Sequence, residues 1–460
     1  MLVKNNFNLY TKLREKFKFF SYESYNIFIE KDNIRFSFCF NLSDRYIFNP
    51  SYNIPFNEYI NYDKLNEENF IENVVFNIGM AELVSYWKSA CPQYVYIIPK
   101  HLTNEQIEWW KNLYFNGLGE FFWLNNIKTN KNDFMTIETS GDKVLLKNLN
   151  LHYSQKTIVP VGGGKDSVVS MELLKNHKNI LPFAINPTTP VFNTIEAAGF
   201  NKDNFFITYR YLDPLLFDLN KKGFLNGHTP FSSIVAFNSL LAAHLTNSKY
   251  IALSNEASSN EPTVPDSTVN HQYSKSILFE NDFRNYVSNY INDELNYFSF
   301  LRPLSELQIA KLFSKFEHQY NAFKSCNVGG KNNIWCCSCA KCLFTYIILS
   351  PFITQTKMKE IFGKNIFDDD KLKNELDKLS GVENIKPFEC VGTVEEVNIA
   401  LQSLDDNEVI NKPLLQHYRN SISANTNYIK LSDYDFQKIN ENNFLPDDFK
   451  TILINALKSI

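Results

Sequence analysis

Residues 159–175 read VPVGGGKDSVVSMELLK, and this order of residue types predicts a strand, a tight turn and the start of a helix. Residues 156–161 supply the short apolar strand, the glycines at 162–164 turn the chain, and the helix begins near Asp166. Such glycines accept positive φ angles and let a phosphate approach the backbone, because they carry no Cβ. The helix N-terminus adds free N–H groups and the positive end of its dipole. The stretch therefore predicts a phosphate site, in which Asp166 binds magnesium and Ser167 donates a hydrogen bond.

The residues that follow extend this unit into a series of alternating strands and helices. Apolar segments at 180–186, 204–212 and 250–256 are predicted strands, and the segments at 193–200 and 231–246 are predicted helices. This alternation favours right-handed crossovers and an α/β fold with a doubly wound parallel sheet. Ligands bind such sheets beyond the carboxyl ends of the strands, which is where the glycine turn falls.

The chain of 460 residues is long enough for two or three domains. The first part is rich in aromatic residues, with predicted strands at 33–42 and 94–99 and a predicted helix at 104–117 that Thr103 caps. We expect three regions: an N-terminal α+β domain at 1–150 with a possible role in substrate binding, a domain at 151–350 that contains the predicted phosphate site and a cysteine-rich loop, and a mainly helical C-terminal region at 351–460.

Composition narrows the class of protein. The net charge of −4 gives no electrostatic basis for binding duplex nucleic acid. The sequence has no apolar run of the ~18 residues that a membrane helix needs, and its first residues lack the apolar core of a secretory signal. We therefore expect a cytoplasmic protein that acts on a small molecule, with no nucleic-acid partner and no membrane association.

Five of the eight cysteines crowd between residues 326 and 342. Cys326, Cys336, Cys339 and Cys342 give the spacing C-x9-C-x2-C-x2-C, which favours a metal site over disulfides in a reducing compartment. Four thiolates usually bind structural zinc. Three alternatives remain at this stage: Cys337 replaces Cys336 as a ligand, the cluster binds iron and sulfide, or the thiols are simply reduced.

Three polar segments between the glycine turn and the cysteines are the other candidates for a site. They span 225–233, 253–263 and 269–276, and the second directly follows a predicted strand at the ligand edge of the sheet. In the third, a histidine, a tyrosine and a lysine alternate, so an extended chain would place them on one face. Any one of these residues has an ordinary structural explanation, but their concentration here favours function. The candidates are Asn255, Glu256, His271, Tyr273 and Lys275.

The glycine turn resembles the pyrophosphate loop (PP-loop) of the N-type ATP pyrophosphatases, Ser-Gly-Gly-x-Asp-Ser, with Gly162 in place of the first serine. It is not a Walker A loop, because Lys165 precedes Asp166. A glycine turn with no ligand is the plainer interpretation, and the Lys-Asp-Ser sequence argues against it. The resemblance implies an adenine-nucleotide α-hydrolase type of fold, ATP cleaved between its α and β phosphates, and Mg²⁺. The residues expected at the nucleotide are Gly162, Gly163, Gly164, Lys165, Asp166, Ser167, Asn255 and Glu256.

A more specific resemblance extends over roughly residues 75–400. The segments ELVSYWKSACP, WWKNLYFNGLGEFFWLN, PVGGGKDS, NGHTPFSS, VNHQYSKS, FLRPLSELQIAKLF, WCCSCAKC and PFECVGTVEE are similar to the ATP-dependent UDP-N-acetylmuramoyl-L-alanyl-L-glutamate epimerase family. This resemblance implies an isomerase of peptidoglycan precursor synthesis. Such an enzyme inverts the terminal L-glutamate to D-glutamate and converts ATP to AMP and pyrophosphate. Its substrate would be the UDP-linked muramoyl dipeptide.

The implied chemistry assigns catalytic roles. Adenylation of the α-carboxylate removes its charge and makes the neighbouring proton acidic enough for a side-chain base. His271 is the first candidate base, with Tyr273 or Lys275 as the opposing acid and Asp166 at the magnesium; a cysteine pair that includes Cys337 is the alternative. Arg302 is a candidate for the UDP phosphates or the glutamate carboxylates. Core packing is the preferred explanation for Trp87, Trp109 and Trp110.

Three other functions compete with this interpretation. An enzyme similar to the 7-cyano-7-deazaguanine synthases would also adenylate a carboxylate and carries a similar cysteine pattern, but it leaves the first region unexplained. A tRNA-modifying member of the superfamily should have a basic surface. A non-catalytic ATP sensor would have a degenerate loop, and pyrophosphate release would exclude it.

Overall fold

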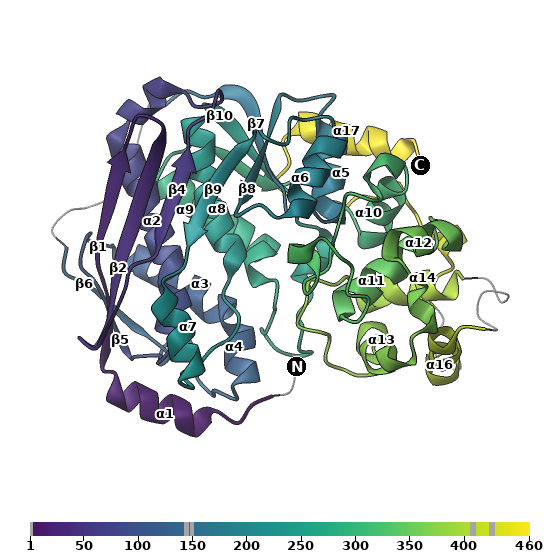
Figure 1. Cartoon of the computed structure of the whole chain (residues 1–460), viewed down its shortest axis with the longest axis horizontal. Coiled ribbons are helices and arrows are strands. Elements are labelled where there is room, and N and C mark those ends of the chain that lie inside the picture. Colours follow the sequence, from purple (N-terminus) through teal and green to yellow (C-terminus); the bar gives the residue numbers. More distant parts are fainter. Residues whose placement is uncertain (1–2, 142–146, 148–150, 405–410, 423–427) are drawn as a thin grey trace.

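The computed structural model describes residues 3–141, 147, 151–404, 411–422 and 428–460, and it has a mixed α/β architecture (Figure 1). The strands are β1 (Phe19–Ile29), β2 (Asn33–Leu42), β3 (Tyr46–Phe48), β4 (Ser51–Pro55), β5 (Tyr94–Ile97), β6 (Thr136–Thr139), β7 (Ser154–Pro160), β8 (Ile180–Ile185), β9 (Phe206–Tyr211), β10 (Ser248–Leu253) and β11 (Asn296–Ser299). The helices are α1 (Phe7–Lys16), α2 (Glu68–Trp87), α3 (Asn104–Gly117), α4 (Gly119–Leu124), α5 (Lys165–Leu174), α6 (Thr189–Ala197), α7 (Pro214–Lys221), α8 (Phe231–Leu245), α9 (Ile277–Tyr290), α10 (Glu306–Phe313), α11 (Ala340–Leu349), α12 (Gln355–Phe362), α13 (Lys373–Ser380), α14 (Val394–Gln402), α16 (Pro413–Ile422) and α17 (Asp447–Lys458).

One large, mostly parallel sheet organises the described residues. Its strands lie in the order β11-β10-β7-β8-β9-β4-β2-β1-β5-β6, and β3 pairs with β2. From β7 the chain adds β8 and then β9 on one side, before β10 and β11 extend the sheet on the other side, all in parallel. The strand order therefore reverses between β7 and β10, and this is the position at which open α/β sheets bind ligands.

Helices cover both faces of the parallel part of the sheet. Consecutive strand residues point to opposite faces. Ile158 of β7 packs into a core with α2, α3, α8 and α9, whereas Val159 packs into a second core with α5, α10 and α11. The predicted mixed α/β class with a large, mostly parallel sheet is confirmed.

The N-terminal strands join the same sheet through an antiparallel pair between β4 and β9. Tyr52 lies opposite Arg210 in this pair. The two side chains share a buried partner, because Glu82 of α2 accepts hydrogen bonds from the Tyr52 hydroxyl at 2.7 Å and from Arg210 Nε at 2.8 Å. The predicted regions 1–150 and 151–350 therefore contribute strands to one continuous sheet; residue 150 itself lies outside the described residues.

Most predicted elements appear with close bounds. Strand β2 covers the predicted 33–42, and α3 covers the predicted 104–117. Thr103 caps α3, since its hydroxyl accepts from Gln106 N–H and the Gln106 side chain accepts from Thr103 N–H. The predicted helix at 193–200 begins earlier, at Thr189, because Pro190 fits the first helical turn. Helices dominate after residue 350, as predicted.

The tryptophans of the first region serve packing. Trp87 and Trp110 are fully buried, and Trp109 packs between Trp110 and Tyr286. Within the described part of the chain, the helices are all too short or too polar to span a bilayer.

Candidate active site

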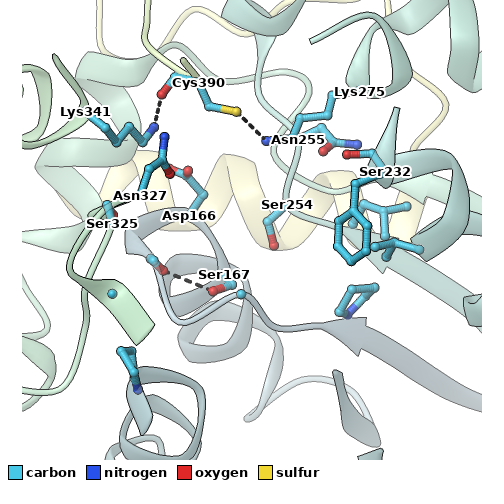
Figure 2. Close-up of a pocket in the computed structure, with 18 of the residues that line it drawn as sticks. Asp166, Ser167, Ser232, Ser254, Asn255, Lys275, Ser325, Asn327, Lys341 and Cys390 are labelled. Carbon is cyan, nitrogen blue, oxygen red and sulfur yellow. Dashed lines mark hydrogen bonds between the residues drawn. The ribbon is translucent and has the colours of Figure 1, made fainter. Parts of the chain in front are cut away.

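A cavity of about 600 Å³ opens at the carboxyl ends of β7 and β10, where the strand order reverses (Figure 2). Residues of the glycine turn form one wall, and Ser254 and Asn255, which follow β10, contribute to another. Lys275 and Cys390 lie across the cavity from the turn. The fold thus brings six of the eight predicted nucleotide residues and one predicted acid–base residue, Lys275, into a single pocket; Gly163 and Lys165 do not line it.

The glycine turn has a defined geometry at each position. Gly163 has φ +76°, and a Cβ there would lie 2.9 Å from the backbone of Pro190, so this position requires glycine. A Cβ at Gly162 would meet nothing within 4 Å. Two residues from a distant segment, Lys324 and Ser325, hydrogen-bond the turn. Lys324 N–H donates to the Gly163 carbonyl at 2.8 Å, and Ser325 Oγ accepts from Lys165 N–H at 3.2 Å.

Lys165 lies beneath the pocket rather than in it. Its side chain is 1% exposed, and its ammonium contacts the carboxylates of Asp166 and, at 2.5 Å, Glu306. Burial by itself lowers the pKa of Lys165, but the two carboxylates outweigh burial and raise this pKa. Burial also raises the pKa of Glu306 above its usual range. Lys165, predicted to face the phosphates, therefore holds Asp166 in place from below.

Asp166 and Ser167 are the side chains of the turn that reach the pocket. A quarter of the Asp166 side chain is exposed there. Burial works against its ionisation, but the ammonium groups of Lys165, Lys341 and Lys275 lower its pKa, so Asp166 is a carboxylate at neutral pH. The Ser167 hydroxyl donates to the Gly164 carbonyl at 3.0 Å and also lines the pocket.

Asn255 and Glu256 lie at the end of β10, as the sequence predicts. Asn255 Nδ2 donates to Ser299 Oγ at 3.0 Å, which fixes the amide at the pocket wall. Glu256 is 4% exposed, and its carboxylate accepts from Ser258 Oγ at 3.3 Å. Both residues line the cavity, and Glu256 adds a second negative charge to that of Asp166.

Cys390 and Lys275 form a close pair on the opposite wall. Lys275 Nζ lies 3.2 Å from Cys390 Sγ, and Lys341 Nζ donates to the Cys390 carbonyl (Figure 2). Burial raises the pKa of the Cys390 thiol, but the charges of Lys275, His271 and Lys341 outweigh burial and lower this pKa to about 6. Cys390 is therefore a thiolate at neutral pH, which is typical of reactive cysteines. No motif or spacing in the sequence distinguishes this residue from an ordinary cysteine.

His271 lies behind Cys390 and connects it to a buried carboxylate. Its Nδ1 is 2.5 Å from Glu120 Oε2, and its ring is close enough to Cys390 for the two groups to shift each other's pKa. The second histidine, His228, is 3.3 Å from the same Glu120 oxygen. Burial lowers the pKa of both rings, and that of His228 falls to about 3. The contacts with Cys390 and Glu120 reverse this effect at His271 and raise its pKa to about 9, so His271 is an imidazolium at neutral pH.

Two other candidates point elsewhere. Tyr273 is directed toward α3, where its hydroxyl accepts from Asn112 Nδ2 at 3.1 Å. Arg302 is fully buried, and its guanidinium donates to the backbone of Glu256 and Lys275 and to the carboxylate of Glu280. Arg302 therefore fixes the two pocket segments from inside the fold, and the prediction that it binds the UDP phosphates or the glutamate carboxylates is wrong.

The four spaced cysteines converge, and Cys337 does not join them. The Sγ atoms of Cys326, Cys336, Cys339 and Cys342 all lie within 4.8 Å of one another. Cys337 has φ +51°, and its thiol donates to the carbonyl of Phe362. Backbone N–H groups donate to the cluster at Cys326 Sγ and Cys339 Sγ, as they do to metal-bound thiolates.

This cluster connects the two walls of the pocket. Cys326 directly follows Lys324 and Ser325, which hold the glycine turn. At the other end, Lys341 lies between Cys339 and Cys342, and its N–H donates to Glu389 at 2.6 Å while its ammonium holds Cys390. The cysteine loop therefore positions residues that contact both the glycine turn and Cys390.

Comparisons with known proteins identify the family of this chain. Residues 11–300 match the family described as the MurL N-terminal domain, and residues 322–431 match the MurL C-terminal domain. A curated protein from Xanthomonas oryzae pv. oryzae (strain MAFF 311018) is 34% identical over 332 residues, which cover 70% of this chain and 72% of the relative. One from a Micromonospora species is 32% identical over 332 residues, which cover 71% of this chain and 73% of the relative. Both are named UDP-N-acetyl-alpha-D-muramoyl-L-alanyl-L-glutamate epimerase. No solved structure matches the chain. The chain therefore belongs to the MurL family of epimerases and is an enzyme of the isomerase class.

Proposed function

We propose that the protein is the ATP-dependent epimerase of UDP-N-acetylmuramoyl-L-alanyl-L-glutamate in peptidoglycan precursor synthesis. The observation that carries the proposal is the shared pocket: Asp166 and Ser167 of the glycine turn face the same cavity as the pair Lys275 and Cys390. The first pair suits phosphate chemistry and the second suits proton transfer. An enzyme that activates a carboxylate with ATP and then inverts the neighbouring carbon needs both.

Three features support ATP as the activating substrate. The turn is followed by the N-terminus of α5, which favours anions. Four lysines but only two carboxylates are among the described pocket residues, so the cavity suits a polyanion: Lys275, Lys324, Lys331 and Lys341, with Asp166 and Glu256. The turn also lies where the strand order reverses, as in doubly wound nucleotide-binding folds. We therefore assign the turn to the pyrophosphate end of ATP, as in the PP-loop superfamily.

Asp166 would hold Mg²⁺ beside this end of the nucleotide. Carboxylates are the preferred protein ligands of Mg²⁺, which neutralises the charge that develops on the leaving pyrophosphate. Lys165 supports this role, because its ammonium keeps Asp166 ionised and fixes its position. Glu306 anchors Lys165 in turn.

Activation explains why an epimerase would consume ATP. The α-proton of a free carboxylate is very weakly acidic, because its removal would create a dianion. Transfer of AMP to the carboxylate removes its charge, and a side chain can then take the proton. Return of a proton on the other face inverts the centre, and water releases the product and AMP.

We further propose that the four cysteines bind one structural Zn²⁺. Tetrahedral zinc with ~2.3 Å bonds places its sulfur ligands about 3.8 Å apart, and Cys336 Sγ lies 3.7 Å from Cys342 Sγ. All four Sγ atoms lie within 4.8 Å of one another, which suits a single ion better than an iron–sulfur cluster, whose four cysteines are divided among two or more irons. Zinc would hold the loop that supports the glycine turn and Lys341.

A direct assay tests the function. The purified protein is incubated with ATP, Mg²⁺ and the UDP-linked dipeptide, and we expect pyrophosphate, AMP and, after acid hydrolysis, D-glutamate. Pyrophosphate that appears only with a deazapurine carboxylate and ammonia would refute the proposal and indicate a 7-cyano-7-deazaguanine synthase. Inversion without ATP would refute the activation step.

A further inference from the structure

The thiol of Cys390 has surroundings that differ from those of a packing cysteine. It lines the cavity across from the glycine turn, in the loop that precedes α14. Lys275 Nζ lies 3.2 Å from its sulfur, and His271 lies behind it, close enough for its charge to lower the pKa of the thiol. Glu120 completes the row, 2.5 Å from His271 Nδ1. A thiol, an imidazole and a carboxylate therefore form a connected chain that ends in the pocket.

We propose that Cys390 is a catalytic residue that transfers the α-proton of the activated glutamate, with Lys275, His271 and Glu120 as positioning residues. This inference rests on the proposed function, because it concerns the second half of that reaction. It assigns the base to a residue outside the candidates that the sequence suggested.

The charges on the wall decide which group can accept a proton. The pKa of His271 is raised to about 9 and that of Lys275 is raised as well, so both are protonated at neutral pH. The neighbouring cations lower the pKa of Cys390 to about 6, so its thiolate is the available base. The charged groups facing this wall are Lys275, His271, Lys341, Glu256 and Asp166, with Glu120 behind His271.

The step balances without any further reactant. The Cα–H bond breaks, its proton forms an S–H bond with Cys390, and the electron pair moves onto the carbonyl oxygen of the acyl phosphate. The reverse step on the same face restores the starting epimer and the thiolate. Delivery of a proton from the opposite face by a second group gives the other epimer.

The test separates activation from proton transfer in Cys390→Ser. Activation is measured as substrate-dependent exchange of labelled pyrophosphate into ATP. Proton transfer is measured as deuterium gained at the glutamate Cα in D₂O, starting from each epimer separately. We expect exchange to be unchanged, epimerisation to fall by at least about 10²-fold, and deuterium incorporation to be lost from one epimer only. Cys39→Ser, in a half-buried position of β2, is the matched control and should behave as the wild type.

Three other results would contradict either the role of Cys390 or the proposed function. Deuterium incorporation at wild-type rates from both epimers in Cys390→Ser would overturn the assignment. A substrate adduct on Cys390, found by mass spectrometry of the quenched wild-type reaction, would also overturn it, because the thiol would then be a nucleophile. Absence of pyrophosphate exchange in the wild type would instead refute the proposed function.

A second variant tests the positioning role and does not require Cys390 to be changed. Glu120→Gln removes the charge that stabilises protonated His271, so the thiolate loses a cation and its pKa should rise. The rate at which iodoacetamide modifies Cys390, followed by peptide mass spectrometry against pH, should have its midpoint near 6 in the wild type and at higher pH in Glu120→Gln. The acidic limb of kcat/KM should move in the same direction. An unchanged midpoint would show that the Glu120–His271 pair does not act on Cys390.

Discussion

The two walls of the pocket are built in different ways. The phosphate wall comes from six consecutive residues, 162–167, whose conformation follows from a strand, a glycine turn and a helix N-terminus. The proton-transfer wall combines Glu120, His271, Lys275 and Cys390, which come from three distant parts of the chain. A local motif is thus sufficient to build the proposed anion site, whereas a shifted thiol pKa requires several charges that only the tertiary fold brings together. The cysteine loop connects the two walls.

The largest effect should come from the phosphate wall. Asp166→Asn removes the charge that would hold Mg²⁺, so pyrophosphate exchange and epimerisation should both fall by at least about 10²–10³-fold. The fold should persist, because Lys165 keeps its contact with Glu306. The exposed Asp203→Asn is the control. If exchange survives in Asp166→Asn while epimerisation is lost, the division of labour between the walls is wrong.

Substitutions in the cysteine loop should lower the stability of the protein more than substitutions in either wall of the pocket. Cys339→Ala, or a strong chelator, would remove the proposed zinc and should lower the apparent Tm by on the order of 10 °C. Metal analysis should give one zinc per chain in the wild type. Cys337→Ala serves as the comparison, since its thiol is directed away from the cluster. A metal-free protein with unchanged Tm would contradict the scaffold role of the loop.

Alanine substitutions at two adjacent glycines of the turn should have smaller effects on stability, and they test the conformation of the turn directly. Gly163→Ala places a Cβ against Pro190 in a conformation with positive φ, and it should cost about 1–3 kcal/mol of stability. Gly162→Ala adds a Cβ where nothing lies within 4 Å, and it should change stability by less than about 0.5 kcal/mol. Denaturant unfolding measures both variants. Equal costs at the two positions would show that the turn has a different conformation.

The smallest effect is the pH dependence of proton transfer at the Cys390 wall. The Cys390 thiolate is present above its lowered pKa of about 6 and is lost as the pH falls through that value. Lowering the pH from about 7.5 to about 5.5 should therefore reduce the rate of deuterium incorporation about fourfold. A deuterium incorporation rate that is flat between about pH 5.5 and 7.5 would count against a thiolate base.

The sequence predicted the local features of this molecule well. The periodicity and caps gave β2 and α3 with their bounds, and the alternation after residue 156 gave the strands and helices of the parallel half. The spacing of four cysteines also identified the thiols that the structure brings together. In each case neighbouring residues carry the information, through side-chain periodicity, capping hydrogen bonds or short loops.

Contacts between distant segments were beyond such reasoning. The joining of the two halves depends on β4 pairing with β9, and no turn or spacing connects residues 51–53 with 209–211. From the sequence, Lys165 is a plausible phosphate ligand. In the structure its buried ammonium instead donates to Glu306, which lies 141 residues away in the chain. Cys390 lies in the segment PFECVGTVEE, and only its contacts with Lys275 and His271 distinguish it from an ordinary cysteine.

In the proposed mechanism, ATP-dependent activation at one wall of the pocket enables proton transfer at the other. The most direct test incubates the wild-type protein and the UDP-linked dipeptide in D₂O, with and without ATP and Mg²⁺, and measures deuterium at the glutamate Cα by mass spectrometry. We predict deuterium incorporation only when ATP is present, together with release of pyrophosphate. Deuterium incorporation at the same rate without ATP would contradict the claim, because the α-proton would then be removed from an unactivated carboxylate.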